Sequence, residues 1–281
     1  MYEAFFVSPQ WLHRHLTDEN IVLVDASAPP PTDPTDYQQR YYQEHIPSAQ
    51  FFNLDTVADQ SNNLPHMLPD EITFTQAVEQ LGISNHHKVV IYDQGALFSA
   101  PRAWWTFKTL GCNNVKILAG GLCGWKKAGY SLDSGMSVVR ERQQFIAKCI
   151  TDQALSQQQV ITLLQQPNVQ FIDARPTARF SAQQPEPRPG LRMGHLPGSK
   201  NVPWDWLVKE GCYKSPAELK AIFAKQQVDI MQPTVISCGS GMTAAVVLLA
   251  ALILLGNKNV KLYDGSWAEW GQDNGLPIET K

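Results

Sequence analysis

Short apolar runs rich in β-branched residues alternate along the chain with stretches of helical character. Such runs cover residues 21–24, 88–92, 169–172 and 233–236, and a helical pattern is expected at 11–16 and at 244–251. Strands that are apolar on both faces are typical of parallel sheets covered by helices. The pattern therefore predicts an α/β fold in which each sheet is mainly parallel and carries helices on both faces.

The first half of the chain matches the second in four places that occur in the same order. The pairs are the strand ends Asp25 and Asp173, the histidines His45 and His195, the strand ends Asp93 and Cys238, and the tryptophans Trp125 and Trp270. Each pair is separated by about 145 to 150 residues, which indicates a duplicated domain. We expect one domain at 1–135, a linker at 136–155 that lacks clear periodicity, and a second domain at 156–281.

The segment Cys238-Gly239-Ser240-Gly241-Met242-Thr243 lies where a predicted strand meets a predicted helix. Its two glycines let the backbone curl tightly, so that N–H groups of the loop and of the first helical turn point at one spot. That spot would hold an anion, and a thiolate there is stabilised as a nucleophile at neutral pH. The first half has Asp93 in this place, so we expect only the second half to be catalytic.

Other functions of this loop are open to direct tests on the residues. A cysteine phosphatase loop needs an arginine six residues after the cysteine, and Ala244 stands there. A nucleotide-binding P-loop would end in Gly-Lys-Ser or Gly-Lys-Thr, which is missing. A buried structural cysteine followed by a glycine turn remains the plain alternative. The chemistry that remains is a small cradle suited to sulfur.

Composition narrows the classes of function. The chain is 43% hydrophobic and 17% charged with a net charge of −3, so no basic excess suggests nucleic acid. The N-terminal residues do not read as a signal peptide, and the apolar run 244–255 is too short to span a bilayer. Five cysteines at irregular spacings indicate neither disulfides nor zinc. We expect a cytoplasmic protein with no membrane partner and no metal.

The residues resemble a known family, the two-domain rhodanese-like sulfurtransferases that act on 3-mercaptopyruvate. The resemblance covers nearly the whole chain, and its motifs are the Cys238 loop, residues 65–69, residues 99–105, Glu186-Pro187-Arg188 and residues 263–270. It implies that a cysteine persulfide is made from 3-mercaptopyruvate with release of pyruvate. The outer sulfur then passes to a thiol such as thioredoxin, or to cyanide, without metal or organic cofactor.

The resemblance also implies the catalytic residues. Cys238 would attack the sulfur of the substrate, and Asp55, His66 and Ser240 match a Ser-His-Asp relay that moves the protons. In the plain alternative, His66 is a structural histidine in a proline-flanked loop and Asp55 caps the next segment. His45 and His195 occupy paired positions in both halves, which favours a structural role for both.

Binding of the substrate would fall to cations and to the loop. Arg179 and Arg188 match the substrate-binding arginines of the family, although surface arginines are usually just solvated. Arg102 is a weaker candidate beside Trp104 and Trp105. The remaining contacts would come from the loop residues Gly239, Gly241, Met242 and Thr243. Asp264, Trp267 and Trp270 are interpreted as residues that support the fold.

Two other functions compete with this one. Thiosulfate:cyanide sulfurtransferases of the same fold usually carry Arg and Lys after the cysteine, and Gly239 and Ser240 supply no such charge. A non-catalytic rhodanese-like binding protein would not need an intact Cys238. The sequence leaves open the physiological acceptor, the oligomeric state, the oxidation state of Cys238, and any redox role of Cys112, Cys123, Cys149 and Cys212.

Overall fold

The computed structural model describes residues 2–150, 152–273 and 275–280, which form two compact units. The first unit comprises residues 2–61, 69–150 and 210–212, and the second comprises 62–68, 152–209, 213–273 and 275–280. Each unit therefore includes a short segment from the other half of the sequence. The predicted boundaries of the domains and the linker stay a prediction.

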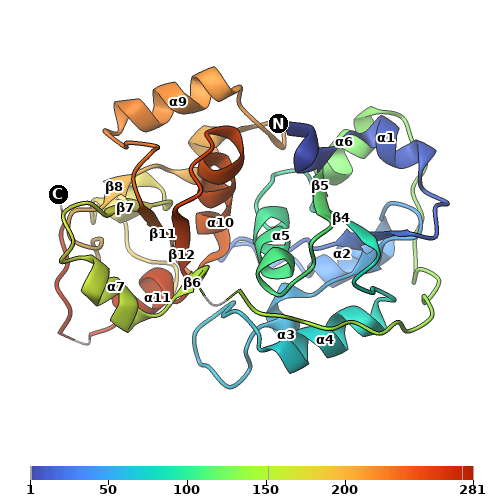
Figure 1. Ribbon diagram of the computed structural model, residues 1–281, viewed down its shortest axis with the longest axis horizontal. Coiled ribbons are helices and arrows are strands. Elements are labelled where there is room, and N and C mark those ends of the chain that lie inside the picture. The colour runs from blue at the N-terminus through green and yellow to red at the C-terminus, as the bar shows by residue number, and fades with distance from the viewer. Residues whose placement is uncertain (1, 151, 274, 281) are drawn as a thin grey trace. The chain divides into compact units, whose positions relative to one another are not determined.

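The first unit is built on a five-stranded sheet with the order β1-β5-β4-β2-β3, in which every neighbouring pair is parallel. Figure 1 labels β4 and β5 of this sheet. Its strands are β1 (Phe6–Val7), β2 (Ile21–Asp25), β3 (Gln50–Phe51), β4 (Lys88–Tyr92) and β5 (Val115–Leu118). Its helices are α1 (Pro9–Arg14), α2 (Tyr37–Gln43), α3 (Leu54–Val57), α4 (Glu71–Gln80), α5 (Ala100–Thr109) and α6 (Gly121–Lys127), after a short 3₁₀ turn at Tyr2–Ala4.

The second unit repeats this plan with the strand order β6-β12-β11-β7-β8, again with parallel neighbours. The strands of its sheet are β6 (Ala154–Leu155), β7 (Gln170–Asp173), β8 (Lys200–Asn201), β11 (Thr234–Ser237) and β12 (Val260–Tyr263). Apart from this sheet, β9 (Val208–Lys209) pairs with β10 (Cys212–Tyr213), of which Cys212 is counted with the first unit and Tyr213 with the second. Its helices are α7 (Gln157–Leu163), α8 (Thr177–Phe180), α9 (Pro216–Lys225), α10 (Met242–Leu249) and α11 (Ser266–Trp270), with a 3₁₀ turn at Trp204–Leu207 and a π-helical turn at Ala250–Leu254.

The two parallel sheets with their helices confirm the α/β fold predicted from the sequence. Paired residues of the two halves lie at equivalent places in them. Trp125 and Trp270 are both fully buried, and each indole N–H donates to a nearby carbonyl, of Ser131 and Pro277 respectively. A buried tryptophan needs such an acceptor for its one polar group. Trp270 therefore supports the fold, as the sequence predicts.

The apolar pattern of α10 places this helix inside the second unit. All but one of its side chains are buried, the exception being the half-buried Thr243. The helix follows β11, a central strand of the sheet. Ligands of such sheets bind at the carboxyl ends of the strands, and the loop between β11 and α10 occupies that position.

Candidate active site

The loop from Cys238 to Gly241 joins β11 to α10, and its carbonyl groups are held from one side. The Cys238 carbonyl accepts the N–H of Trp267 at 2.9 Å, and the Gly239 carbonyl accepts the N–H of Ala268 at 2.9 Å. Both donors belong to the first turn of α11. Cys238 itself is 2% exposed.

The two glycines of the loop are needed for different reasons. Gly241 has φ 74°, a left-handed conformation that glycine adopts without strain, and it precedes the first residue of α10. Gly239 has no such φ. A Cβ at Gly239 would lie 3.0 Å from Nη2 of Arg179, so this glycine leaves room for a guanidinium. The expected tight curl therefore depends on Gly241 alone.

Four backbone N–H groups of this loop and of the first turn of α10 have no acceptor among the described residues: those of Gly239, Ser240, Met242 and Thr243. The N–H of Gly241, which the sequence places with them, instead donates to Oγ of Ser266 at 3.1 Å. Free N–H groups at the start of a helix favour an anion. The loop therefore offers an anion cradle beside Cys238.

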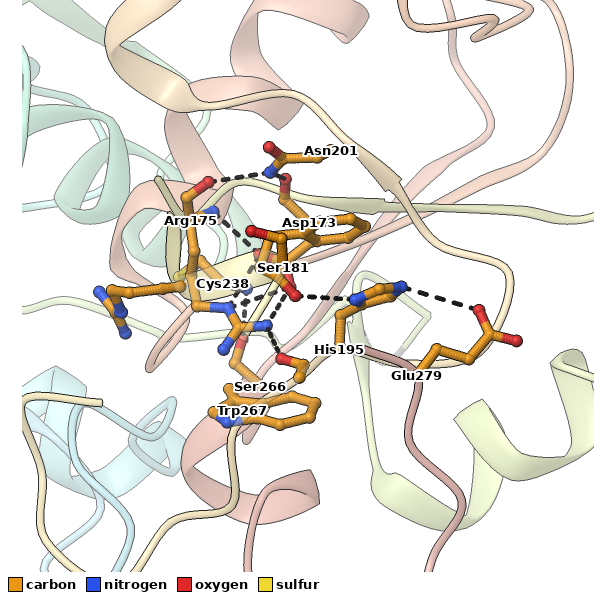
Figure 2. Close-up of polar contacts among 12 residues, drawn as sticks. Asp173, Arg175, Ser181, His195, Asn201, Cys238, Ser266, Trp267 and Glu279 are labelled. Atoms are coloured by element: carbon orange, nitrogen blue, oxygen red, sulfur yellow. Dashed lines mark hydrogen bonds and ion pairs between the residues drawn. The ribbon is translucent and has the colours of Figure 1, made fainter. Parts of the chain in front are cut away.

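Ser266 anchors this loop, a role that the sequence did not reveal. Its Oγ accepts the N–H of Cys238 at 3.1 Å (Figure 2). It also accepts the N–H of Gly241 at 3.1 Å and donates to the carbonyl of Tyr263 at 2.8 Å. Ser266 is fully buried and has φ 50°. The equivalent residue of the first half is Gly121, with φ 53°. Both halves therefore have a left-handed residue at this position, which the structure shows.

His66 and Ser240 form a direct contact within the second unit. Nδ1 of His66 lies 2.9 Å from Oγ of Ser240. The segment is also held by the N–H of Leu68, which donates to Oδ2 of Asp264 at 2.7 Å. Nη2 of Arg188 donates to the same Ser240 Oγ at 3.3 Å. Because arginine can only donate, the hydroxyl hydrogen of Ser240 remains available for Nδ1 of His66.

Asp55, the third member of the predicted relay, belongs to the first unit. It lies in the first turn of α3, and its N–H donates to the side chain of Asn53, which caps the helix, at 3.0 Å. Its place in the relay stays a prediction.

Arg179 lies on α8 and is held by a carboxylate that the sequence had shown only as part of a motif. Its Nε donates to both carboxylate oxygens of Glu186, and its Nη2 donates to Oε2. Glu186 also accepts from Nη1 of Arg175 at 2.7 Å. Arg175 is a buried arginine that the sequence did not single out. Its signal was a cation two residues after the strand-end acid Asp173.

The equivalent loop of the first unit is filled by its own side chain. The carboxylate of Asp93 accepts the N–H groups of Gly95, Leu97, Ser99 and Ala100 at 2.9 to 3.2 Å. This loop thus gathers N–H groups around the side chain that stands in place of Cys238. A carboxylate side chain there leaves neither a thiol nor room for an incoming anion.

The first unit also lacks the polar pair found at Ser240. By the offset of the repeat, Gly95 corresponds to Ser240 and Gly211 to His66. Gly211 has φ 71°, and a Cβ there would lie 2.2 Å from the carbonyl oxygen of Gly95. Two glycines in tight contact therefore stand where the second unit has a histidine and a serine.

The remaining candidates have structural surroundings. Nδ1 of His45 and of His195 lies 2.8 Å from the carbonyl of Tyr41 and of Phe180, respectively, and both histidines are buried. Arg102 is 2% exposed, with its guanidinium carbon 4.6 Å from the ring centroid of Trp105. Trp267 and Asp264 are buried as well.

Comparisons with known proteins agree with this architecture. The model of the rhodanese-like domain matches residues 8–128 and 156–273. The 3-mercaptopyruvate sulfurtransferase of Escherichia coli K12 is 45% identical over 280 residues, 99% of each chain. The thiosulfate sulfurtransferase of mouse is 39% identical over 279 residues, which cover 96% of this chain and 92% of that one. The crystal structure of SseA from Escherichia coli, a 3-mercaptopyruvate sulfotransferase, is 43% identical with a TM-score of 0.86 and covers 95% of this chain and 100% of that one.

The chain therefore belongs to the rhodanese-like family, with two copies of the domain. Its relatives are sulfurtransferases that it matches over nearly their whole length. Among the described residues, no helix has the length and apolar character needed to cross a membrane, and no cluster of three or more potential metal ligands is found.

Proposed function

We propose that this protein takes sulfur from 3-mercaptopyruvate, carries it as a persulfide on Cys238, and passes it to a thiol or to cyanide. The observation that carries the proposal is the contrast between the two loops. In the first loop the carboxylate of Asp93 accepts the N–H groups. In the second loop, which begins with Cys238, N–H groups remain without an acceptor among the described residues. An anionic sulfur on Cys238 supplies the missing acceptor.

The first half-reaction moves one sulfur atom. The Cys238 thiolate attacks the thiol sulfur of 3-mercaptopyruvate, an S–S bond forms, and the C–S bond breaks. The electron pair of that bond passes to the three-carbon fragment as the enolate of pyruvate, which takes up a proton. Arg179 and Arg188 bind the carboxylate and carbonyl oxygens of the substrate, where they also meet the charge that develops on the enolate.

Proton transfer is assigned to Ser240 and His66, with Asp55 as the proposed third member. The 2.9 Å contact between His66 and Ser240 and the donation from Arg188 support a hydroxyl that gives its hydrogen to the imidazole. The first unit, which has no cysteine in its loop, has glycines in both positions. A residue pair present only beside the nucleophile is the pattern expected of groups that serve the reaction.

The second half-reaction returns Cys238 to a thiolate. A thiol such as thioredoxin, or cyanide, attacks the outer sulfur of the persulfide, and the electron pair of the S–S bond stays on Cys238. Five free cysteines fit a reducing compartment, so we place the protein in the cytoplasm.

Thiosulfate is the second candidate donor, because the mouse thiosulfate sulfurtransferase is also a close relative at 39% identity. Against it, Gly239 and Ser240 add no cation beside the nucleophile, whereas thiosulfate carries two negative charges. The match to the Escherichia coli 3-mercaptopyruvate enzyme is also higher, at 45%.

The test compares both donors in steady-state sulfur transfer to cyanide, with Cys238→Ser as the blank. We expect kcat/KM for mercaptopyruvate to exceed that for thiosulfate by more than about a hundredfold, roughly 2.7 kcal/mol of differential transition-state binding. Mass spectrometry after exposure to mercaptopyruvate alone should show one added sulfur on Cys238. A preference for thiosulfate would contradict the proposed substrate. Activity with neither donor would contradict the proposal that the protein is a sulfurtransferase.

A further inference from the structure

Glu186 lies buried between two arginines of the second unit. Its side chain is 3% exposed, and its carboxylate accepts from Nη1 of Arg175 at 2.7 Å and from Nε of Arg179 at 3.1 and 3.2 Å. A buried carboxylate bound to two guanidinium groups forms strong, charge-assisted hydrogen bonds. Glu186 therefore links the position of Arg179 to that of Arg175.

Arg175 is fixed to the central sheet. Its side chain is 1% exposed and donates to both carboxylate oxygens of Asp173, at the end of β7, and to the carbonyl of Gly194 at 2.7 Å. The guanidinium carbon lies 4.3 Å from the ring centroid of Trp267 (Figure 2). Burial alone would lower the pKa of Arg175, but Asp173 and Glu186 together raise it, so this arginine stays charged.

The backbone around this pair is held as well. The side-chain amide of Asn201 donates to the carbonyls of Asp173 and Arg175 at 3.0 and 2.9 Å (Figure 2). A continuous series of contacts thus runs from β7 through Arg175 to Glu186. Because β7 is part of the sheet, these contacts hold Glu186, and the guanidinium bound to it, in a fixed position.

Arg179 is the member of this series that meets the loop of Cys238. Its Nη2 is close enough to Gly239 that an added Cβ would lie 3.0 Å away. Glu186 takes up Nε and one side of Nη2, and Nη1 has no acceptor among the described residues. Arg188, two residues after Glu186, reaches Ser240 in the same loop.

We propose that Glu186 is a positioning residue of the sulfur-transfer site, which holds the guanidinium of Arg179 ready for the carboxylate of the donor. The inference rests on the proposed function. A free arginine side chain must be ordered when the substrate binds, at a cost in conformational entropy. A guanidinium already clamped by Glu186 avoids that cost, so the clamp strengthens binding of a carboxylate donor without entering the chemistry.

The test separates the two half-reactions in Glu186→Gln, which keeps the shape of the side chain and removes its charge. We expect kcat/KM for mercaptopyruvate to fall about 10- to 100-fold, mainly through a higher KM, because binding is lost in the ground state and the transition state alike. Discharge of the persulfide by cyanide needs no carboxylate recognition. After Cys238 is loaded with inorganic polysulfide, the rate at which cyanide removes the sulfur from the variant should stay within twofold of the wild-type rate.

The matched control is Glu79→Gln. Glu79 makes a similar carboxylate–guanidinium pair with Arg142 in the first unit, at 2.7 Å, and all kinetic constants should stay unchanged. If Glu186→Gln does not fold, Glu186→Asp keeps the charge with a shorter reach and should give a smaller rise in KM.

Two results would overturn the role of Glu186. One is a mercaptopyruvate kcat/KM within twofold of the wild type, and the other is an equal loss of both half-reactions, which indicates a structural role. Failure of the proposed function is a distinct outcome, because the wild-type protein itself would then transfer no sulfur from mercaptopyruvate.

Discussion

Asp25 is a buried acid of the first unit, and it lacks the arginine partner that the equivalent acid of the second unit has. Its counterpart Asp173 is paired with Arg175, whereas the residue two positions after Asp25 is Ser27. Oδ1 of Asp25 accepts the N–H of Ser27 at 2.9 Å, and Oδ2 is buried without a hydrogen-bond partner among the described residues. Burial raises the pKa of Asp25 from its ordinary value of 3.8 to about 6, although Ser27, through its hydrogen bond, and the nearby hydroxyl of Tyr92 oppose part of the shift. We predict that Asp25→Asn removes a pH-dependent loss of stability.

The direction follows from the raised pKa. Between pH 3.8 and about 6 the folded protein keeps a proton on Asp25 that the unfolded chain releases, so stability falls as the pH rises. A shift of roughly two pKa units corresponds to about 3 kcal/mol, fully expressed at pH 7 and absent well below pH 4. About 1.3 kcal/mol of this loss falls between pH 5 and pH 7. An asparagine, which does not titrate, loses none of it.

Urea denaturation at pH 5, 6 and 7 measures the effect as the difference between wild type and Asp25→Asn. The difference cancels titrations elsewhere, since distant sites contribute additively. Asp205→Asn, at an exposed aspartate, is the control and should leave the pH profile of the wild type unchanged. If the stability of Asp25→Asn and of the wild type changed in parallel from pH 5 to pH 7, Asp25 would not carry a raised pKa.

Three further variants test the loops. Ser266→Ala leaves two buried N–H groups without an acceptor. We expect the free energy of unfolding in urea to fall by about 2 kcal/mol or more and persulfide formation on Cys238 to become roughly tenfold slower. An unchanged rate would refute the anchoring role. Gly239→Ala should displace Arg179 and raise the KM for mercaptopyruvate about tenfold, while alkylation of Cys238 by iodoacetamide keeps its rate. Asp93→Asn removes the charge that four N–H groups bind; we expect about 2 to 4 kcal/mol of lost stability with sulfur transfer unchanged, and equal stability would contradict the filled-loop interpretation.

The repeat and the sheets were predictable because they depend on local patterns. Apolar runs of strand length recur at the same offset, and each run forms an interior strand of its sheet. Helix α1 begins at Pro9 rather than at Trp11, since Ser8 accepts the N–H of Trp11 and caps the helix. Serine followed by proline is a known start signal for a helix, so the sequence itself indicates this boundary.

The contacts around Cys238 were less predictable because they join residues distant in the sequence. The loop motif and the family resemblance point to Cys238, Ser240 and His66, but the roles of Ser266 and Glu186 depend on where α11 and the segment that carries Glu186 pack. Gly239 shows the same limit. Its sequence context suggested backbone freedom, and only the packing reveals a neighbouring guanidinium.

The two halves of the chain solve one physical problem in two ways, and the difference explains why the second half carries supporting contacts of its own. The first loop gathers its N–H groups around Asp93, an anion that never leaves, so the bound charge itself holds the loop in shape. A sulfur carrier cannot depend on its cargo in this way, because the anion arrives and departs in every cycle. Its loop and cations must be held from outside, by Ser266 on one side and by Glu186 through Arg175 on the other. Catalysis on this fold thus requires a rigid empty cradle in addition to a cysteine, and replacing Asp93 by cysteine alone would not supply one.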